Sequence, residues 1–261
     1  MRFSILLFLI SSLLLALSAK SFEIFPSRQE EDLVLWSWES ADNFDFIESK
    51  QKPPQIAAYQ GTIVLGRETA TLVPRKNTLH IPLGIQSFPV YRIETARPNE
   101  PSSKAAFKAA ELILLKRLAK NTVSRLQIDF DAGYLDRKVY GDFLKSLKEQ
   151  LPTRTKLSIT ALSSACLADK WMKELSADEV VCMLFSMGKG KEQILNSLTK
   201  RLPNSGGKQV QSFGISINER ITNQSLKQSG VLRPGRRIYA FSSLGWTRAR
   251  YSYLLKELGQ K

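Results

Sequence analysis

The sequence predicts an α/β protein, a (β/α)8 barrel of the TIM type with a β insertion between its second and third strands. Three observations predict this fold. Eight short apolar segments of strand character recur along the chain, helical segments separate most of them, and 261 residues suit a closed barrel. Such alternation favours parallel strands joined by right-handed crossovers. An open doubly wound sheet would need a glycine-rich phosphate loop after an early strand, and the sequence has none.

The insertion interrupts the first part of the predicted barrel. Residues 33–38 and 56–65 are apolar enough for strands one and two, with a short helix or turn over 42–50 between them. Residues 69–94 contain extended pieces separated by Pro and Gly. We therefore expect this segment to be the β insertion, ending in strand three over residues 90–94.

Helices and strands alternate regularly after residue 94. Ser102 and Ser103 are candidate caps of a long helix through Lys120, and Asp136 is the candidate cap of a helix that stops before Pro152. The other predicted elements are strands over residues 126–131, 157–161, 180–187, 213–217 and 237–242, and helices over 168–175, 192–202 and 247–258.

The first residues have the pattern of a secretory signal peptide. A basic start at Arg2 precedes an almost wholly apolar run over residues 5–19 that ends in small residues. This run is shorter than the roughly 20 residues that cross a bilayer, which favours cleavage near Ala19 over a retained anchor. We expect a signal peptide over 1–19, one barrel domain over 30–261, and an exported, periplasmic or extracellular protein with no membrane span after cleavage.

Composition narrows the choice of partners. A net charge of +14 favours anionic surroundings, such as a polysaccharide or a phosphate-bearing envelope polymer. A surface tuned for solubility is the alternative, because the Lys and Arg residues are scattered along the chain. The sequence has no nucleic-acid motif, so no nucleic-acid partner is expected. It does not predict the oligomeric state.

Cysteine and histidine usage limits the chemistry. Cys166 and Cys182 either form a disulfide in an oxidising compartment or remain two buried thiols. His80 is the only histidine, which excludes a metal site built from several histidines. The run Gly188-Lys189-Gly190-Lys191 lacks the spacing of a P-loop. No cofactor and no metal site are therefore expected.

Strand four carries the most distinctive polar pattern. Apolar and polar side chains alternate over residues 126–131, so Gln127, Asp129 and Asp131 are expected on the inner face of the barrel. Two enclosed acids repel each other and lose hydration, so at least one should titrate abnormally. Ser158 and Thr160 of strand five are the expected hydrogen-bond partners. A purely structural polar plug is the alternative, but active sites of such barrels form at the carboxyl ends of the strands.

Other strand ends are expected to reach the same mouth. Trp38 and Glu39 end strand one, Glu219 follows strand seven and Trp246 follows strand eight. Exposed aromatic rings at a mouth suit stacking on sugar rings. The alternative for each Trp taken singly is a place in the core, which is the more frequent role of this residue. Met183 and Phe185 in strand six are expected to fill space instead.

Four segments resemble the bacterial family numbered 3142 among the domains of unknown function. They are LWSWE at 35–39, QIDFDA at 127–132, LSITAL at 157–162 and MLFSMG at 183–188. The resemblance covers about residues 33–246 and implies an exported bacterial TIM barrel, distantly similar to glycoside hydrolases, without implying a reaction. More distantly, strand four, strand six and Trp246 resemble family-18 chitinase-type barrels, which carry D-x-D-x-E on strand four with the Glu as the acid. Asp129 and Asp131 match the two Asp positions, and Gly133 stands at the position of that Glu.

The first functional hypothesis is a glycoside hydrolase. Such enzymes generally use two carboxyl groups, about 5–5.5 Å apart for retention or about 6.5–9.5 Å apart for inversion. Asp131 would be the acid, Glu219 the nucleophile or base, and Asp129 would orient or tune Asp131. The expected substrate-binding residues are Trp38, Glu39, Gln127 and Trp246.

The alternative is a non-catalytic glycan-binding or envelope-associated barrel. Gly133 favours it, because the position of the family-18 acid lacks a carboxyl group. The basic composition favours it too, because a positive surface attracts phosphate-bearing polymers. Both hypotheses place the site among the carboxylates at the barrel mouth.

Overall fold

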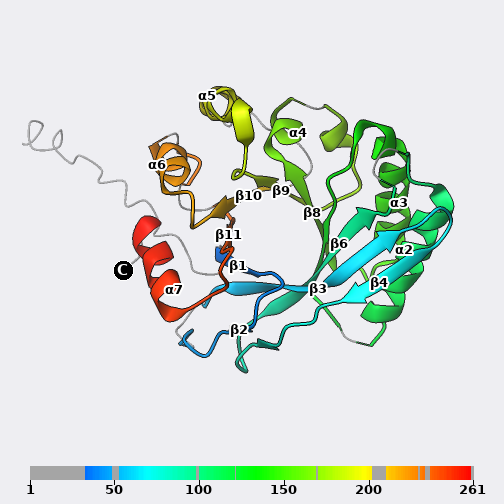
Figure 1. Cartoon of the computed structure of the whole chain (residues 1–261), viewed down its shortest axis with the longest axis horizontal. Coiled ribbons are helices and arrows are strands. Elements are labelled where there is room, and N and C mark those ends of the chain that lie inside the picture. The colour runs from blue at the N-terminus through cyan, green and yellow to red at the C-terminus, as the bar shows by residue number, and fades with distance from the viewer. Residues whose placement is uncertain are drawn as a thin grey trace, which may run out of the picture.

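Eight parallel strands form a closed barrel (Figure 1), which confirms the predicted fold class. The computed structural model describes residues 33–48, 53–97, 100–120, 122–168, 170–201, 210–228, 230–232 and 236–259. The barrel closes because β1 pairs in parallel with both β11 and β3. In chain order its strands are β1 (Leu33–Ser37), β3 (Gln55–Leu65), β6 (Ser87–Thr95), β7 (Arg125–Asp129), β8 (Lys156–Leu162), β9 (Glu179–Met183), β10 (Val210–Ser216) and β11 (Ile238–Phe241).

The predicted β insertion lies between β3 and β6. Its first strand, β4 (Ala70–Pro74), pairs antiparallel with the second half of β3. A second short strand, β5 (Leu79–His80), pairs with β2 (Asp42–Asn43) in a separate two-stranded sheet. The helix considered over residues 42–50 is therefore not formed in the described part of that segment: β2 and turns occupy it. Asp42 accounts for this, because its carboxylate accepts hydrogen bonds from Ser37 and Ser40 and ties the segment to the end of β1.

Helices surround the remaining wall of the barrel (Figure 1). Ser103 caps the first of them, since its Oγ accepts a hydrogen bond from the amide of Ala106 at 3.0 Å. Asp136 does not act as the predicted cap, because its carboxylate accepts the amide of Ser102 at 2.7 Å instead. The helices are α2 (Lys104–Leu118), α3 (Arg137–Gln150), α4 (Ser163–Ala168), α5 (Lys191–Arg201), α6 (Arg220–Gln228) and α7 (Arg248–Glu257).

The side chains of the sheet divide into two layers. Leu126 and Ile128 belong to the apolar layer between sheet and helices, as the alternation in strand four predicts. Inside the barrel, Val34, Val90 and Tyr239 belong to a separate apolar cluster. The interior is therefore packed below the mouth, as expected for a barrel of this size.

An ionic cluster fills the end of the barrel opposite the mouth. Glu179, at the start of β9, accepts hydrogen bonds from Tyr239 at 2.7 Å and Ser212 at 2.6 Å. Arg125 and Arg237 lie 3.3 Å and 3.4 Å from its carboxylate. Burial raises the pKa of Glu179, but Arg125 and the other partners outweigh burial, and the pKa is lowered. This carboxylate is therefore fully compensated and serves the structure.

A disulfide joins Cys166 of α4 to Cys182 of β9, with 6.0 Å between their Cα atoms. Of the two states left open by the sequence, the structure thus contains the bonded one. Among the helices of the described ranges, none combines the length and hydropathy needed to span a bilayer. The predicted signal peptide over residues 1–19 lies outside the described residues.

Candidate functional site

A cavity of about 290 Å³ opens at the carboxyl ends of the strands. We call it the mouth cavity. Its walls come from six of the eight barrel strands or from the residues that follow them, so the barrel itself fixes their positions. The lining residues are Trp36, Trp38, Arg92, Asp129, Asp131, Leu162, Met183, Phe185, Ser186 and Phe241.

Asp129 is the last residue of β7 and lies at the floor of this cavity. Its side chain is buried, and Thr160 Oγ1 donates a hydrogen bond to Oδ1 at 2.6 Å. Arg92 Nη1 donates to Oδ2 at 3.1 Å. Burial raises the pKa of Asp129 and outweighs the opposing effects of Thr160 and Arg92. The predicted abnormal titration of an inner acid and its predicted contact with Thr160 are therefore both supported.

Asp131 lies two residues beyond the end of β7, because the strand is shorter than the sequence suggested. Its side chain is exposed and lines the mouth cavity together with Asp129. The negative charge of Asp131 also raises the pKa of Asp129, which indicates that the two carboxylates are close. The pair thus opens to solvent through Asp131, while Asp129 is engaged by the protein.

Arg92 is the charged residue of this site that the sequence analysis missed. It is directly opposite Asp129 in the pairing of β6 with β7. Its Nε donates to Glu94 at 2.6 Å, and its guanidinium carbon lies 5.8 Å from the ring centroid of Trp38. The alternation of Val90 and Arg92 in predicted strand three already places a cation on the inner face, so the signal was present.

Aromatic rings form the walls of the mouth cavity. Trp38 stacks on Tyr59 with 4.6 Å between ring centroids. Phe185 and Phe241 stack almost parallel, with 5.5 Å between centroids and 7° between planes. Met183 and Phe185, which the sequence predicts as space-filling residues, are among the residues that line the cavity. β9 ends at Met183, so Phe185 belongs to the segment that follows the strand.

Glu219 lies behind the cavity rim and is not one of the lining residues. Its Oε1 accepts the backbone amide of Ser186 at 2.7 Å, and its Oε2 accepts the hydroxyl of Thr222 at 2.9 Å. Ser186 does line the cavity and has a backbone φ of 52°, a left-handed conformation that is unfavourable for most residues. Both carboxylate oxygens of Glu219 are thus engaged, one by the rim residue Ser186 and the other by Thr222 of α6.

Three predicted substrate-binding residues have other contacts. Glu39 accepts the amides of Lys76 and Asn77 and so anchors the insertion. Gln127 is fully buried and donates to Ser158 at 3.1 Å, below the cavity floor. Trp246 is only 5% exposed, and its indole Nε1 donates to the carbonyl of Trp36 at 2.9 Å. The expectation of an exposed Trp246 at the mouth is therefore wrong, because the ring completes the core behind β1.

The described residues include no cluster of three or more His, Cys, Asp or Glu side chains that could hold a metal ion. Asp129 and Asp131 are the only two acids among the residues that line the mouth cavity, and Asp129 already forms an ion pair with Arg92. The arrangement can therefore hydrogen-bond hydroxyl groups and stack on a ring, and it contains one solvent-facing carboxylate.

Solved structures with a similar fold include carbohydrate-active enzymes. The catalytic domain of a family GH18 chitinase from the fern Peteris ryukyuensis matches with a TM-score of 0.56 at 13% sequence identity, over 88% of this chain and 100% of that chain. The spore cortex-lytic enzyme SleL of Bacillus megaterium QM B1551 matches with a TM-score of 0.55 at 12% identity, over 90% of this chain and 75% of that chain.

This likeness concerns the fold. The chain is a (β/α)8 barrel similar in architecture to those of glycoside hydrolases. Neither a family model nor a curated protein sequence matches it. Membership of the family numbered 3142 therefore stays a prediction from the four sequence segments.

Proposed function

We propose that this protein is a carbohydrate-directed barrel that binds a saccharide in the mouth cavity. The observation that carries the proposal is the combination of aromatic walls with a polar floor in one cavity. Aromatic faces attract the polarised C–H groups of sugar rings. Carboxylate and guanidinium groups hydrogen-bond sugar hydroxyls and fix their orientation.

The dimensions of the site suggest how much of a glycan it would hold. Its volume of about 290 Å³ is just below the range for small-molecule sites, which begins at about 300 Å³. We therefore expect one sugar ring inside the cavity, with the neighbouring rings of an oligosaccharide outside it. Oligomers of N-acetylglucosamine are the first ligands to test, because a chitinase is among the proteins of similar fold.

Intrinsic tryptophan fluorescence offers a direct test, since Trp36 and Trp38 line the cavity. Titration with N-acetylglucosamine oligomers should give a saturable change in emission. Trp38→Ala should weaken binding roughly two- to tenfold, because it removes a stacking face, and aromatic stacking contributes about 0.5–1.5 kcal/mol. Tyr253→Ala, which removes a half-buried aromatic ring of α7 outside the cavity, should leave the affinity unchanged. Equal effects of the two variants, or no saturable binding of any glycan in a broad panel, would contradict the proposal.

Hydrolysis is the second candidate function, and one observation favours it. Asp129 has a raised pKa and shares a cavity with the exposed Asp131, and glycoside hydrolases need a carboxyl group that stays protonated beside an ionised one. Against it, both oxygens of Asp129 are engaged, and Gly133 stands at the position of the family-18 acid.

Release of reducing ends separates the two functions. A binding protein releases none and keeps its affinity in Asp131→Asn, because an amide still hydrogen-bonds sugar hydroxyls. A hydrolase releases reducing ends and loses this activity in Asp131→Asn. Asp142→Asn is the matched control, because Asp142 is an exposed acid of α3 that lies outside the mouth cavity.

An exported location belongs to the same proposal. The disulfide between Cys166 and Cys182 supports it, because disulfides persist in oxidising compartments. The apolar run over residues 5–19 supports it independently. N-terminal sequencing of the protein purified from its natural host should find a start near residue 20, and an intact Met1 would contradict export by cleavage.

A further inference from the structure

The outer side of the barrel carries a second concave surface, of about 460 Å³, between β4 and the last turns of α2. These two elements lie beside each other in Figure 1. Apolar side chains of Ala70, Leu72 and Ile113 contribute to its lining. Thr71 and three cations complete the lining. The cations are Lys116, Arg117 and Lys120, and we call this surface the basic groove.

The cations of the basic groove have no opposite charge beside them. All three are exposed, and none forms an ion pair with a residue that the structure describes. No acid lines the groove. Lys116 and Arg117 lie in the last turn of α2, and Lys120 follows its C-cap, Ala119, so three like charges gather at one end of the helix. The helix dipole favours cations at this end, but their mutual repulsion opposes that gain.

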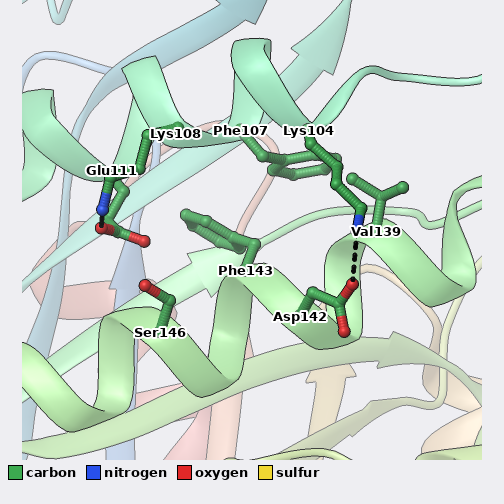
Figure 2. A pocket seen from close by; sticks show the side chains of 8 residues that line it. All are labelled: Lys104, Phe107, Lys108, Glu111, Val139, Asp142, Phe143 and Ser146. Atoms are coloured by element: carbon green, nitrogen blue, oxygen red, sulfur yellow. Dashed lines mark hydrogen bonds and ion pairs between the residues drawn. The ribbon is translucent and has the colours of Figure 1, made fainter.

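A neighbouring groove on the other side of α2 shows the usual arrangement for comparison. It lies between α2 and α3 and has a volume of about 150 Å³ (Figure 2). There Lys104 lies 3.6 Å from Asp142, and Lys108 binds Glu111. Cations of the same helix are thus paired on the face toward α3 and unpaired at the basic groove.

We propose that the basic groove binds a linear, phosphate-bearing polyanion. Three cations converge on a concave surface, which a flexible chain can enter, whereas a flat bilayer reaches only its rim. The apolar lining can contact the uncharged parts of such a chain. The net charge of +14 attracts a polyanion over a longer range. This surface shares no residue with the mouth cavity, so the inference goes beyond the proposed function.

Long-chain inorganic polyphosphate is the probe for a binding assay at two salt concentrations. If three phosphates are contacted, counterion release should weaken binding roughly 20- to 40-fold between about 50 mM and 200 mM salt. The triple variant Lys116→Gln, Arg117→Gln, Lys120→Gln should lose most of the affinity and most of this salt dependence. Urea unfolding of the variant should match that of the native protein, because the changed side chains are exposed.

A matched control removes the same charge elsewhere. Lys138, Lys145 and Lys173 are exposed lysines outside both the basic groove and the mouth cavity. Their triple Gln variant should bind polyphosphate like the native protein. Equal weakening in the two triple variants would overturn the proposal, because net charge alone would then explain binding. Absence of polyphosphate binding would overturn it as well.

Two further probes identify the partner chemistry. Orthophosphate at the same total phosphate concentration should compete poorly with polyphosphate, and equal competition would reduce the groove to a single-phosphate site. Vesicles of phosphatidylglycerol and phosphatidylcholine should bind the groove variant and the native protein equally well. A groove-dependent loss of vesicle binding with unchanged polyphosphate binding would assign the surface to a membrane instead. Saccharide titration of the same variants tests the mouth cavity separately.

Discussion

Arg92 and Asp129 are direct neighbours across the pairing of β6 with β7, and the guanidinium Nη1 donates to the Asp129 carboxylate at 3.1 Å. The strand beside the carboxylate pair thus supplies its counter-charge. Even so, burial dominates, and the pKa of Asp129 is raised. The site therefore contains an acid that binds its proton more tightly in the folded protein than in the unfolded chain.

This relationship predicts an unusual pH dependence for Asp129. A raised folded pKa means that the native state binds more protons than the unfolded state above pH 3.8, so stability falls as pH rises through this window. The native protein should lose stability relative to Asp129→Asn as pH rises from about 4 toward 7. Urea unfolding of both proteins at several pH values measures the difference. A native protein that gains stability relative to the variant would show that Arg92 outweighs burial.

Glu219 provides a second prediction, about the rim. Glu219→Ala should weaken saccharide binding several-fold, because Ser186 loses the partner of its amide. Glu219→Gln should keep the affinity, since the amide oxygen of Gln still accepts this hydrogen bond. The comparison also tests the nucleophile or base role expected from the sequence. If the protein proves to be a hydrolase and Glu219→Gln abolishes turnover without loss of binding, the residue is catalytic and not a positioning residue.

The alternation of strand four predicted most of the site floor. Leu126 and Ile128 face the helices, Asp129 faces the cavity, and Thr160 is its partner as expected. These features follow from the two-residue period of a strand, which needs no knowledge of neighbouring segments. The cavity itself depends on which strands are adjacent, and the parallel pairing of β7 with β6 was implied by the barrel.

The residues that were misplaced share one cause. Trp246 and Glu219 follow strand ends, where the period-two rule no longer applies and the loop conformation decides the direction of a side chain. Trp246 turns into the core because its amide and indole bind Asp42 and Trp36, more than 200 residues earlier. Helix α6 was missed although its nine residues are amphipathic, because the segment is short and contains only two apolar side chains, Ile221 and Leu226.

Glu179 yields a prediction for the opposite end of the barrel. Its pKa is lowered, so its contribution to stability is present above pH 4.5 and is lost as pH falls through the folded pKa. Glu179→Gln should cost about 3 kcal/mol at pH 7, because Arg125 and Arg237 lose their partner. The cost should shrink as the pH falls through the folded pKa, because the native carboxyl group then becomes protonated.

Glu48→Gln is the control for this prediction. Glu48 lies 3.5 Å from Arg248 in an exposed ion pair, and such pairs contribute about 0–1 kcal/mol. Urea unfolding across the same pH range measures both variants. A cost for Glu179→Gln that stays constant with pH would show that shape and hydrogen bonding, and not charge, explain its contribution.

The disulfide between Cys166 and Cys182 gives the last prediction. It links α4 to the strand whose final residue, Met183, lines the mouth cavity. The two cysteines are 16 residues apart, and closing a loop of about this length stabilises a protein by about 3 kcal/mol through the unfolded state. Dithiothreitol should lower the free energy of unfolding of the native protein by about that amount. A Cys166→Ala, Cys182→Ala variant should be less stable from the start and insensitive to the reductant.

Saccharide affinity should survive in that variant in the absence of denaturant, because the lining residues of β9 are also held by pairing with β8 and β10. Loss of affinity in a variant that is still folded would show that the bond also shapes the cavity.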